Sequence, residues 1–212
     1  MTSEGRGRGY GSVTGVGAVT GIVLAGGRSS RFGSDKLAAE VAGGLTLLEA
    51  SVLGIAPLVT EVIVVLTPGD DRRLPMAGVP VRRVADPESF EGPLVGLRAG
   101  LDAATEPIVL AVGGDMPAMR APVLAALLRA LLAADASVGA AVLATRGRLV
   151  PLPAALRTGR ASDEVGRLVD DGERRLRSVF SRLPTRVLED VEWRPLDPEG
   201  DTLRDVDRAE DL

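Results

Sequence analysis

The sequence predicts a doubly wound α/β sheet, and three observations support this fold class. Short apolar runs of strand length alternate with segments whose apolar residues recur at helical spacing. Two of the runs, 62–66 and 108–112, are apolar throughout, which is typical of parallel strands covered on both faces. The links between segments are short, so right-handed helical crossovers are predicted to join successive strands.

The first half of the chain is predicted to contain three strands and one helix. The first strand, 19–24, leads into a glycine-rich loop, and apolar residues at helical spacing follow at 45–58. The run 62–66 is mostly β-branched and is followed by a Pro-Gly turn. The segment 79–84 is expected to be an outer strand, because Pro80 has no N–H to donate to a central ladder.

The second half continues the alternation. Helical spacing at 94–104 precedes the strand 108–112, and helical spacing at 123–134 precedes a fifth strand at 138–143. A hairpin turn is expected at 146–148, leading into a further strand. No internal repeat is visible.

Composition agrees with one packed domain, 19–212. The chain has 212 residues and is 45% hydrophobic, which is enough for one sizeable core. Aromatic residues amount to only 2%, so that core must be built from Val, Leu, Ile and Ala.

The segment 1–18 is predicted to be a disordered tail, because it is rich in Gly, Ser and Thr. It lacks the apolar centre of a signal peptide. No segment approaches the ~20 consecutive apolar residues that a membrane span needs. We therefore expect no membrane association and a cytoplasmic location.

The net charge and the absence of two residue types limit the ligands and reactions that are expected. The net charge is −4 and the arginines are scattered, so the chain offers no basic stripe for a nucleic acid. Cysteine and histidine are both absent, so any metal must be held by oxygen atoms. Oxygen ligands favour magnesium, or manganese, over zinc. The same absences remove the usual nucleophiles and general bases.

Lys36 is the only lysine in the chain, and it closes the run Leu24-Ala25-Gly26-Gly27-Arg28-Ser29-Ser30-Arg31-Phe32-Gly33-Ser34-Asp35-Lys36. Lysine is a compact point charge that suits phosphate oxygens, whereas arginine is a planar fork. Glycine-rich backbone after a buried strand can also turn N–H groups toward an anion. The run therefore predicts a phosphate-binding loop, although it is neither a Walker A loop nor a Gly-x-Gly-x-x-Gly motif.

Asp115 follows the strand 108–112 and two glycines, so its side chain is expected at the same carboxyl edge of the sheet. Magnesium is commonly held by one or two carboxylates together with waters and substrate phosphates. Asp115 is therefore the best single candidate for a metal ligand. A plain turn aspartate after the strand is the alternative.

The glycine-rich run resembles the signature loop of the MobA-like nucleotidyltransferases, Leu-Ala-Gly-Gly-x-Ser-x-Arg-Met-Gly-x-Asp-Lys, with Phe32 in place of methionine. Three further segments resemble family motifs in the same order, namely Gly92-Pro93-Leu94-Val95-Gly96-Leu97, Asp115-Met116-Pro117 and the terminal 205–212. The resemblance covers roughly residues 20–212. It implies a mixed, mostly parallel sheet of the Rossmann-like nucleotidyltransferase type.

The resemblance also implies roles for individual residues. Arg31 would join Lys36 and Asp115 in catalysis at the phosphates. Either Asp205 or Asp207 would be the second metal ligand, unless this acidic segment is simply a solvated face. The residues expected to bind nucleotide are Leu24, Ala25, Gly26, Gly27, Lys36, Asp86, Gly92, Pro93 and Asp115.

The implied activity is magnesium-dependent nucleotidyl transfer, with pyrophosphate as the leaving group. Within the family the chain looks most like the molybdenum cofactor guanylyltransferases, which join GMP from GTP to the phosphate of molybdopterin and work beside other proteins of cofactor biosynthesis. It departs from them at 150–152, where a histidine is lacking, and at Arg208-Ala209, which replaces Thr-Pro. A cytidylyltransferase for the same pterin, a sugar-phosphate nucleotidyltransferase and a regulatory protein that only binds nucleotide remain as alternatives.

Overall fold

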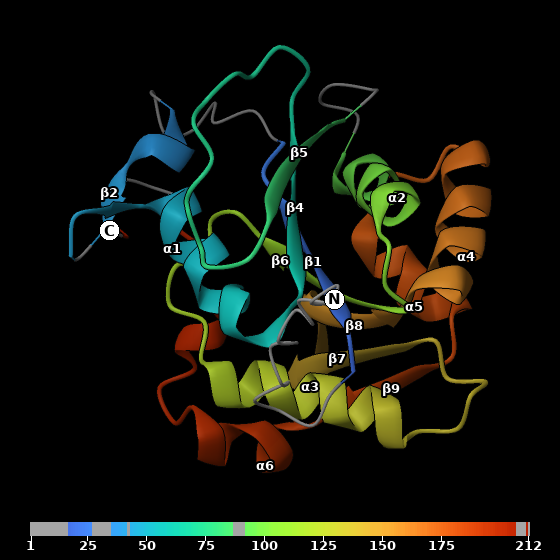
Figure 1. Cartoon of the computed structure of the whole chain (residues 1–212). Helices are drawn as coiled ribbons and strands as arrows, with labels where there is room; N and C mark the ends of the chain where they lie inside the picture. Colours follow the sequence, from blue (N-terminus) through green and yellow to red (C-terminus); the bar gives the residue numbers. More distant parts are fainter. Residues whose placement is uncertain (1–16, 27–34, 42, 87–91, 207–210, 212) are drawn as a thin grey trace, which may run out of the picture.

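The computed structural model describes residues 17–26, 35–41, 43–86, 92–206 and 211. Its centre is a seven-stranded sheet with the order β5-β4-β1-β6-β8-β7-β9, and helices cover both faces of the sheet (Figure 1). The predicted tail 1–18 lies outside the described residues except for 17 and 18. None of the described helices is long and apolar enough to cross a membrane.

The sheet is mixed, and its first four strands are all parallel to one another. Neighbours pair in parallel among β5 (Val81–Ala85), β4 (Glu61–Leu66), β1 (Val19–Leu24) and β6 (Ile108–Gly113). Then β8 (Arg148–Arg157) runs antiparallel to both β6 and β7 (Ala140–Thr145), and β9 (Thr185–Leu188) pairs in parallel with β7. The predicted α/β fold class and mixed sheet are confirmed.

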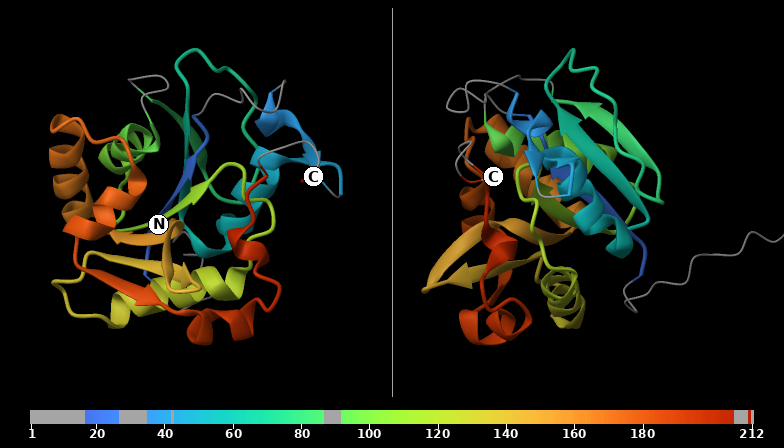
Figure 2. Two further views of the ribbon diagram at one scale, coloured as in Figure 1. Left: turned by 180° about the vertical axis from the view of Figure 1, so that it is seen from behind. Right: turned by 90° about the vertical axis from the view of Figure 1, so that its left-hand side faces the viewer.

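Each face of the sheet has its own core. One core joins the sheet to α1 (Leu47–Ile55), α3 (Ala121–Ala133) and α6 (Asp190–Trp193). The other joins it to α2 (Pro93–Ala103), α4 (Thr158–Asp170) and α5 (Val179–Arg182). Figure 2 shows the two helical layers from further directions. Val, Leu, Ile and Ala dominate both cores as expected, and buried Trp193 is the large exception.

Several boundaries differ from the predicted ones for local reasons. The helix predicted at 45–58 is shorter in the structure, because Leu45–Thr46 pairs with Glu40–Val41 as a separate two-stranded sheet. A capping box between Thr46 and Glu49 then begins α1. The last turn of the predicted helix, Ala56–Leu58, is a 3₁₀ helix. The fifth strand begins at Ala140 rather than at 138, because the Val138 N–H donates to the Asp135 carbonyl in a turn.

Strand edges and turns agree more closely with the sequence. The outer strand expected at 79–84 is β5, and it does lie at an edge of the sheet. At the hairpin between β7 and β8, Arg146 has φ 51° and Gly147 has φ 71°. Two successive positive φ values are typical of a type I′ turn, whose twist matches the flanking strands.

The packing of α2 on β1 gives a stability prediction. A Cβ added at Gly100 would lie 2.7 Å from Ile22 Cγ2 and 3.2 Å from Val65 Cγ2, whereas one added at Gly166 of α4 would meet nothing within 4 Å. We expect Gly100→Ala to lower the free energy of unfolding by about 1–3 kcal/mol. Gly166→Ala should raise it by about 0.5–1 kcal/mol, because alanine loses less backbone entropy in a helix. Urea unfolding of both variants checks this, and equal stabilities would contradict the close packing.

The chain order creates a switch point beside β1. After β5, α2 carries the chain across to β6 on the opposite side of β1. Ligands of open α/β sheets bind at such a point, beyond the carboxyl ends of the strands. Here the two strand ends are joined directly, since the Gly114 N–H donates to the Leu24 carbonyl over 2.9 Å.

Candidate active site

Lys36 and Asp115 form an ion pair at this switch point. Lys36 Nζ donates to Asp115 Oδ2 over 2.9 Å, although the two residues are 79 positions apart. The Lys36 side chain is only 13% exposed and that of Asp115 is 33% exposed. The structure therefore brings together the two residues that the sequence placed at the same sheet edge by separate arguments.

Local structure explains how Lys36 reaches this position. Lys36 begins a short 3₁₀ helix, Lys36–Ala38, whose N-cap is Asp35. The Asp35 carboxylate accepts from the Leu37 N–H over 3.2 Å, which satisfies one of the donors that a helix start leaves open. At the far end, the Leu47 N–H donates to the Ala39 carbonyl over 2.9 Å and ties the segment to the start of α1.

Asp115 is held by the backbone around it. A Cβ added at Gly113 would lie 2.6 Å from Asp115 Oδ1, so only glycine lets the carboxylate fold back over the end of β6. The Asp115 carbonyl accepts from the Val206 N–H over 3.0 Å. Val206 is buried, and exposed Asp205 immediately precedes it. The terminal segment therefore lies against Asp115 through the backbone of Val206.

Asp86 lies among glycines at the end of β5. It is 4% exposed, and its N–H donates to the Leu66 carbonyl over 2.8 Å. A Cβ added at Gly26 or at Gly96 would lie 3.6 Å from Asp86 Oδ2. The carboxylate of Asp86 therefore faces the backbone of both the glycine-rich run and α2, so three predicted nucleotide-binding segments converge there.

Gly92 and Pro93 form the start of α2. Gly92 has φ 119°, and a Cβ there would lie 2.9 Å from the Arg174 carbonyl, so the position requires glycine. The same carbonyl accepts from the Leu94 N–H over 3.3 Å. The segment after α4 thus covers the start of α2, a contact that the sequence did not predict.

Part of the predicted site lies outside the described residues. Gly27, Arg31 and Asp207 all fall there. Leu24 and Ala25 are described, and the Ala25 N–H donates to the Val65 carbonyl over 2.9 Å, next to Gly26. That either Asp205 or Asp207 is the second metal ligand stays a prediction.

The carboxylates near the switch point are of the type that binds magnesium, but they do not form a cluster of acidic side chains. Among the described residues, no group of three or more Asp, Glu, His or Cys side chains is placed to hold a metal. One or two carboxylates suffice for magnesium when substrate phosphates and waters supply the other ligands. Asp115 is one such carboxylate after the end of β6, and Asp205 directly precedes Val206, whose N–H donates to the Asp115 carbonyl.

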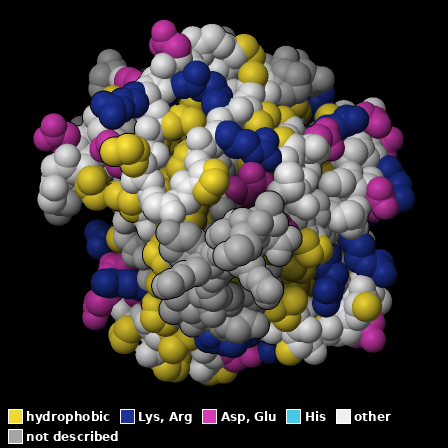
Figure 3. Space-filling model, in the orientation of Figure 1, with side chains coloured by type: hydrophobic (Ala, Val, Ile, Leu, Met, Phe, Trp, Pro, Cys, Tyr) yellow, Lys and Arg dark blue, Asp and Glu magenta, His cyan; other side chains and the backbone are white. Residues whose placement is uncertain are grey.

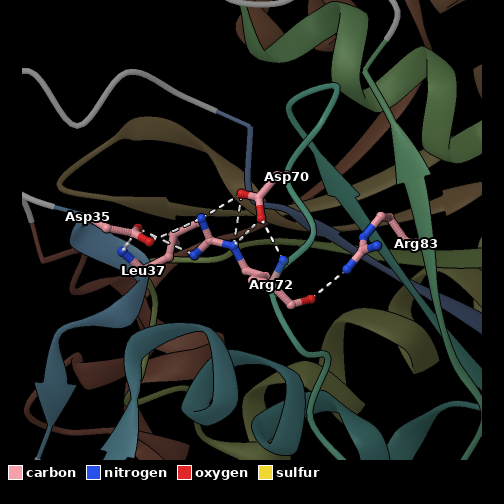
Figure 4. Close-up of polar contacts among 5 residues, drawn as sticks. All are labelled: Asp35, Leu37, Asp70, Arg72 and Arg83. Carbon is pink, nitrogen blue, oxygen red and sulfur yellow. Dashed lines mark hydrogen bonds and ion pairs between the residues drawn. The ribbon is translucent and has the colours of Figure 1, made fainter.

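Sequence reasoning missed Arg72, which lies in the link between β4 and β5. Its guanidinium contacts both Asp35 and Asp70 (Figure 4). Hydrogen bonding from Arg72 lowers the pKa of Asp70 below its ordinary value, and the same contact raises the pKa of Arg72. The sequence signal was slight, because Asp70-Asp71-Arg72-Arg73 resembles any solvated charged turn.

Charged side chains of both signs are interspersed over the rest of the surface in view. Figure 3 shows basic side chains next to acidic ones, with apolar side chains between them, rather than one continuous basic patch. This pattern matches the scattered arginines of the sequence.

The chain is similar to one protein family and to several named relatives. The model of the MobA-like NTP transferase domain matches residues 21–187. A probable molybdenum cofactor guanylyltransferase of Chloroflexus aggregans is 35% identical over 196 residues, covering 92% of this chain and 91% of its relative. A molybdenum cofactor guanylyltransferase of Burkholderia ambifaria is 36% identical over 185 residues, covering 81% of this chain and 86% of its relative.

Solved structures agree on the fold. Molybdopterin-guanine dinucleotide biosynthesis protein A of Archaeoglobus fulgidus superposes with a TM-score of 0.73 at 21% identity, covering 91% of this chain and 94% of that one. The 2-C-methyl-D-erythritol 4-phosphate cytidylyltransferase of Thermus thermophilus gives a TM-score of 0.64 at 21% identity, covering 92% and 95%. At these identities the superpositions establish shared architecture and no shared substrate.

Proposed function

Because the chain belongs to the MobA-like NTP transferase domain family, we propose that it is a molybdenum cofactor guanylyltransferase. In this proposal it transfers GMP from GTP to the phosphate of molybdopterin and releases pyrophosphate. The relatives that bear this name cover most of the chain at about one-third identity, with 35% for the Chloroflexus aggregans protein. The cytidylyltransferase alternative is supported only by a likeness of fold.

The observation that carries the proposal is the ion pair between Lys36 and Asp115 at the switch point. A protein that had lost catalysis would have no need to hold its only lysine 2.9 Å from a carboxylate at that edge. This ion pair argues against the regulatory alternative.

The proposed reaction needs little covalent chemistry from the protein. An oxygen of the acceptor phosphate forms a bond to the α-phosphorus of GTP, and the bond from that phosphorus to the pyrophosphate oxygen breaks. The attacking oxygen is already anionic, so no side chain has to remove a proton, which agrees with the absence of His and Cys. Catalysis then consists mainly of alignment and of neutralising charge.

In this proposal the residues predicted from the sequence would each have a part in the reaction. The Lys36 ammonium would neutralise phosphate oxygens, with Arg31 as its proposed helper. Asp115, together with Asp205 or Asp207, would hold magnesium. When bound, magnesium supplies further positive charge at the phosphates. Asp86 and the start of α2 would receive the nucleoside end. A cytoplasmic location and contacts with other proteins of cofactor biosynthesis belong to the same proposal.

A panel of four nucleotides tests the base preference. We expect GTP with magnesium to raise the melting temperature more than ATP, CTP or UTP does, because a ligand that binds only the folded state stabilises it. At a concentration about 100 times its Kd, the gain is about 2.7 kcal/mol. Differential scanning fluorimetry measures the shifts. Four equal shifts would remove the base preference, and a preference for CTP would move the assignment to the cytidylyl branch.

A further inference from the structure

Arg72 connects the link between β4 and β5 to the residue just before Lys36. Its Nη2 lies 3.2 Å from Asp35 Oδ2, and its Nη1 donates to Asp35 Oδ1 over 3.3 Å. Its Nε donates to both oxygens of Asp70, over 2.9 Å each. Figure 4 shows the guanidinium between the two carboxylates. One planar fork therefore bridges two acidic residues from different segments.

The Arg72 end of this bridge is firmly held. The Asp70 carboxylate also accepts from the Arg72 backbone N–H over 3.1 Å, so Arg72 and Asp70 form a compact turn. Arg83 of β5 donates to the Arg72 carbonyl, which fixes the turn to the edge strand. The side chains of Arg72 and Asp70 are 23% and 19% exposed, compared with 52% for Asp35. The Arg72 turn is therefore the more buried partner in the contact.

The Asp35 end leads directly to Lys36. Asp35 caps the three-residue 3₁₀ helix that begins at Lys36, and a helix this short gains little stability of its own. Its direction therefore depends on contacts at its ends. The same Asp35 carboxylate serves both the cap and the bridge to Arg72.

We propose that Arg72 is a positioning residue: by holding Asp35, it sets the direction of the short helix and so keeps Lys36 aimed at the phosphate site. This inference rests on the proposed function, because it assumes that Lys36 contacts nucleotide phosphates. Arg72 acts through Lys36 and does not itself touch the nucleotide.

The test measures whether Arg72 and Lys36 contribute to GTP binding independently or through one another. We would measure the Kd of GTP with magnesium by calorimetry for wild type, Arg72→Gln, Lys36→Met and the double variant. Arg72→Gln alone should weaken binding about three- to fivefold, the range expected for a partly exposed ion pair. In the Lys36→Met background, Arg72→Gln should cause no further loss, because the residue it positions is gone.

Two further variants serve as controls for the effect of Arg72→Gln. Asp35→Asn keeps an oxygen for the Leu37 cap but removes the charge that Arg72 holds, so it should weaken GTP binding as much as Arg72→Gln does. It also tests the contact between Arg72 and Asp35 if Arg72→Gln fails to fold. Arg73→Gln changes the exposed neighbour in the same turn and should leave the Kd unchanged.

The outcomes separate the two proposals. If Lys36→Met weakens binding but Arg72→Gln is silent, the positioning role is wrong and the proposed function stands. If the losses from Arg72→Gln and Lys36→Met simply add, Arg72 contacts the nucleotide directly and the positioning role is again wrong. If Lys36→Met is itself silent, the phosphate role of Lys36 and the role of Arg72 both fail.

Discussion

Replacing Lys36 by arginine should lower turnover at least about tenfold while leaving the free energy of unfolding close to that of wild type. The charge survives this change, so a solvated lysine would tolerate it. Lys36 is instead 13% exposed, and its Nζ lies 2.9 Å from Asp115 Oδ2. A planar guanidinium is wider than a compact ammonium, so arginine should not place its charge in the same position. A tenfold loss corresponds to roughly 1.4 kcal/mol of transition-state stabilisation.

Steady-state release of pyrophosphate from GTP and molybdopterin measures this effect. Arg73→Lys is the matched control, because it makes the reverse exchange on the exposed turn nearby and should leave turnover unchanged. Wild-type turnover in a folded Lys36→Arg protein would show that the only lysine of the chain has no special part in the reaction.

Replacing Asp115 by asparagine should slow the reaction at least about tenfold and raise the magnesium concentration needed for half-maximal rate. Asparagine keeps the size and one coordinating oxygen but removes the negative charge that a hard cation prefers. The same change leaves the Lys36 ammonium beside a neutral amide instead of a carboxylate. Both consequences act at the phosphates rather than on the fold.

Magnesium titrations of the rate for the wild type and Asp115→Asn check this expectation, with manganese as the second metal. Asp102→Asn provides a control, since that carboxylate is 63% exposed on α2 and lies 4.0 Å from Arg98. Asp205→Asn and Asp207→Asn should then differ from one another, with only one of them sharing the magnesium effect. Unchanged turnover and unchanged magnesium dependence in Asp115→Asn would remove the proposed metal site.

Much of the fold was predictable because its strands are strongly patterned. The continuous apolar runs of β4 and β6 identified buried parallel strands, and Pro80 pointed correctly to an edge. Boundaries were less predictable where tertiary contacts decide them. The pairing of Leu45–Thr46 with Glu40–Val41, for example, removes two residues from the expected helix and depends on a partner strand that has no strong pattern.

The site was predictable to the extent that it follows from chain topology. Lys36 and Asp115 each follow a strand that ends at the switch point, so their meeting could be anticipated from the order of elements. Arg72 could not be anticipated in this way. Its role depends on a side-chain contact between two links, and the sequence around it has the composition of an ordinary solvated turn. The contact of the Arg174 carbonyl with the start of α2 could not be anticipated either, because it joins backbone groups that are far apart in the sequence.

Identification of the product shows whether this chain transfers GMP to molybdopterin. The purified protein would be incubated with molybdopterin, magnesium and an equal mixture of GTP and CTP, and the pterin product would be analysed by mass spectrometry. We expect a pterin carrying one added GMP, together with an equal amount of pyrophosphate. The Lys36→Arg variant should form this product more slowly than the wild type does. A pterin carrying CMP, or no nucleotide adduct from a protein that binds GTP, would contradict the proposed function.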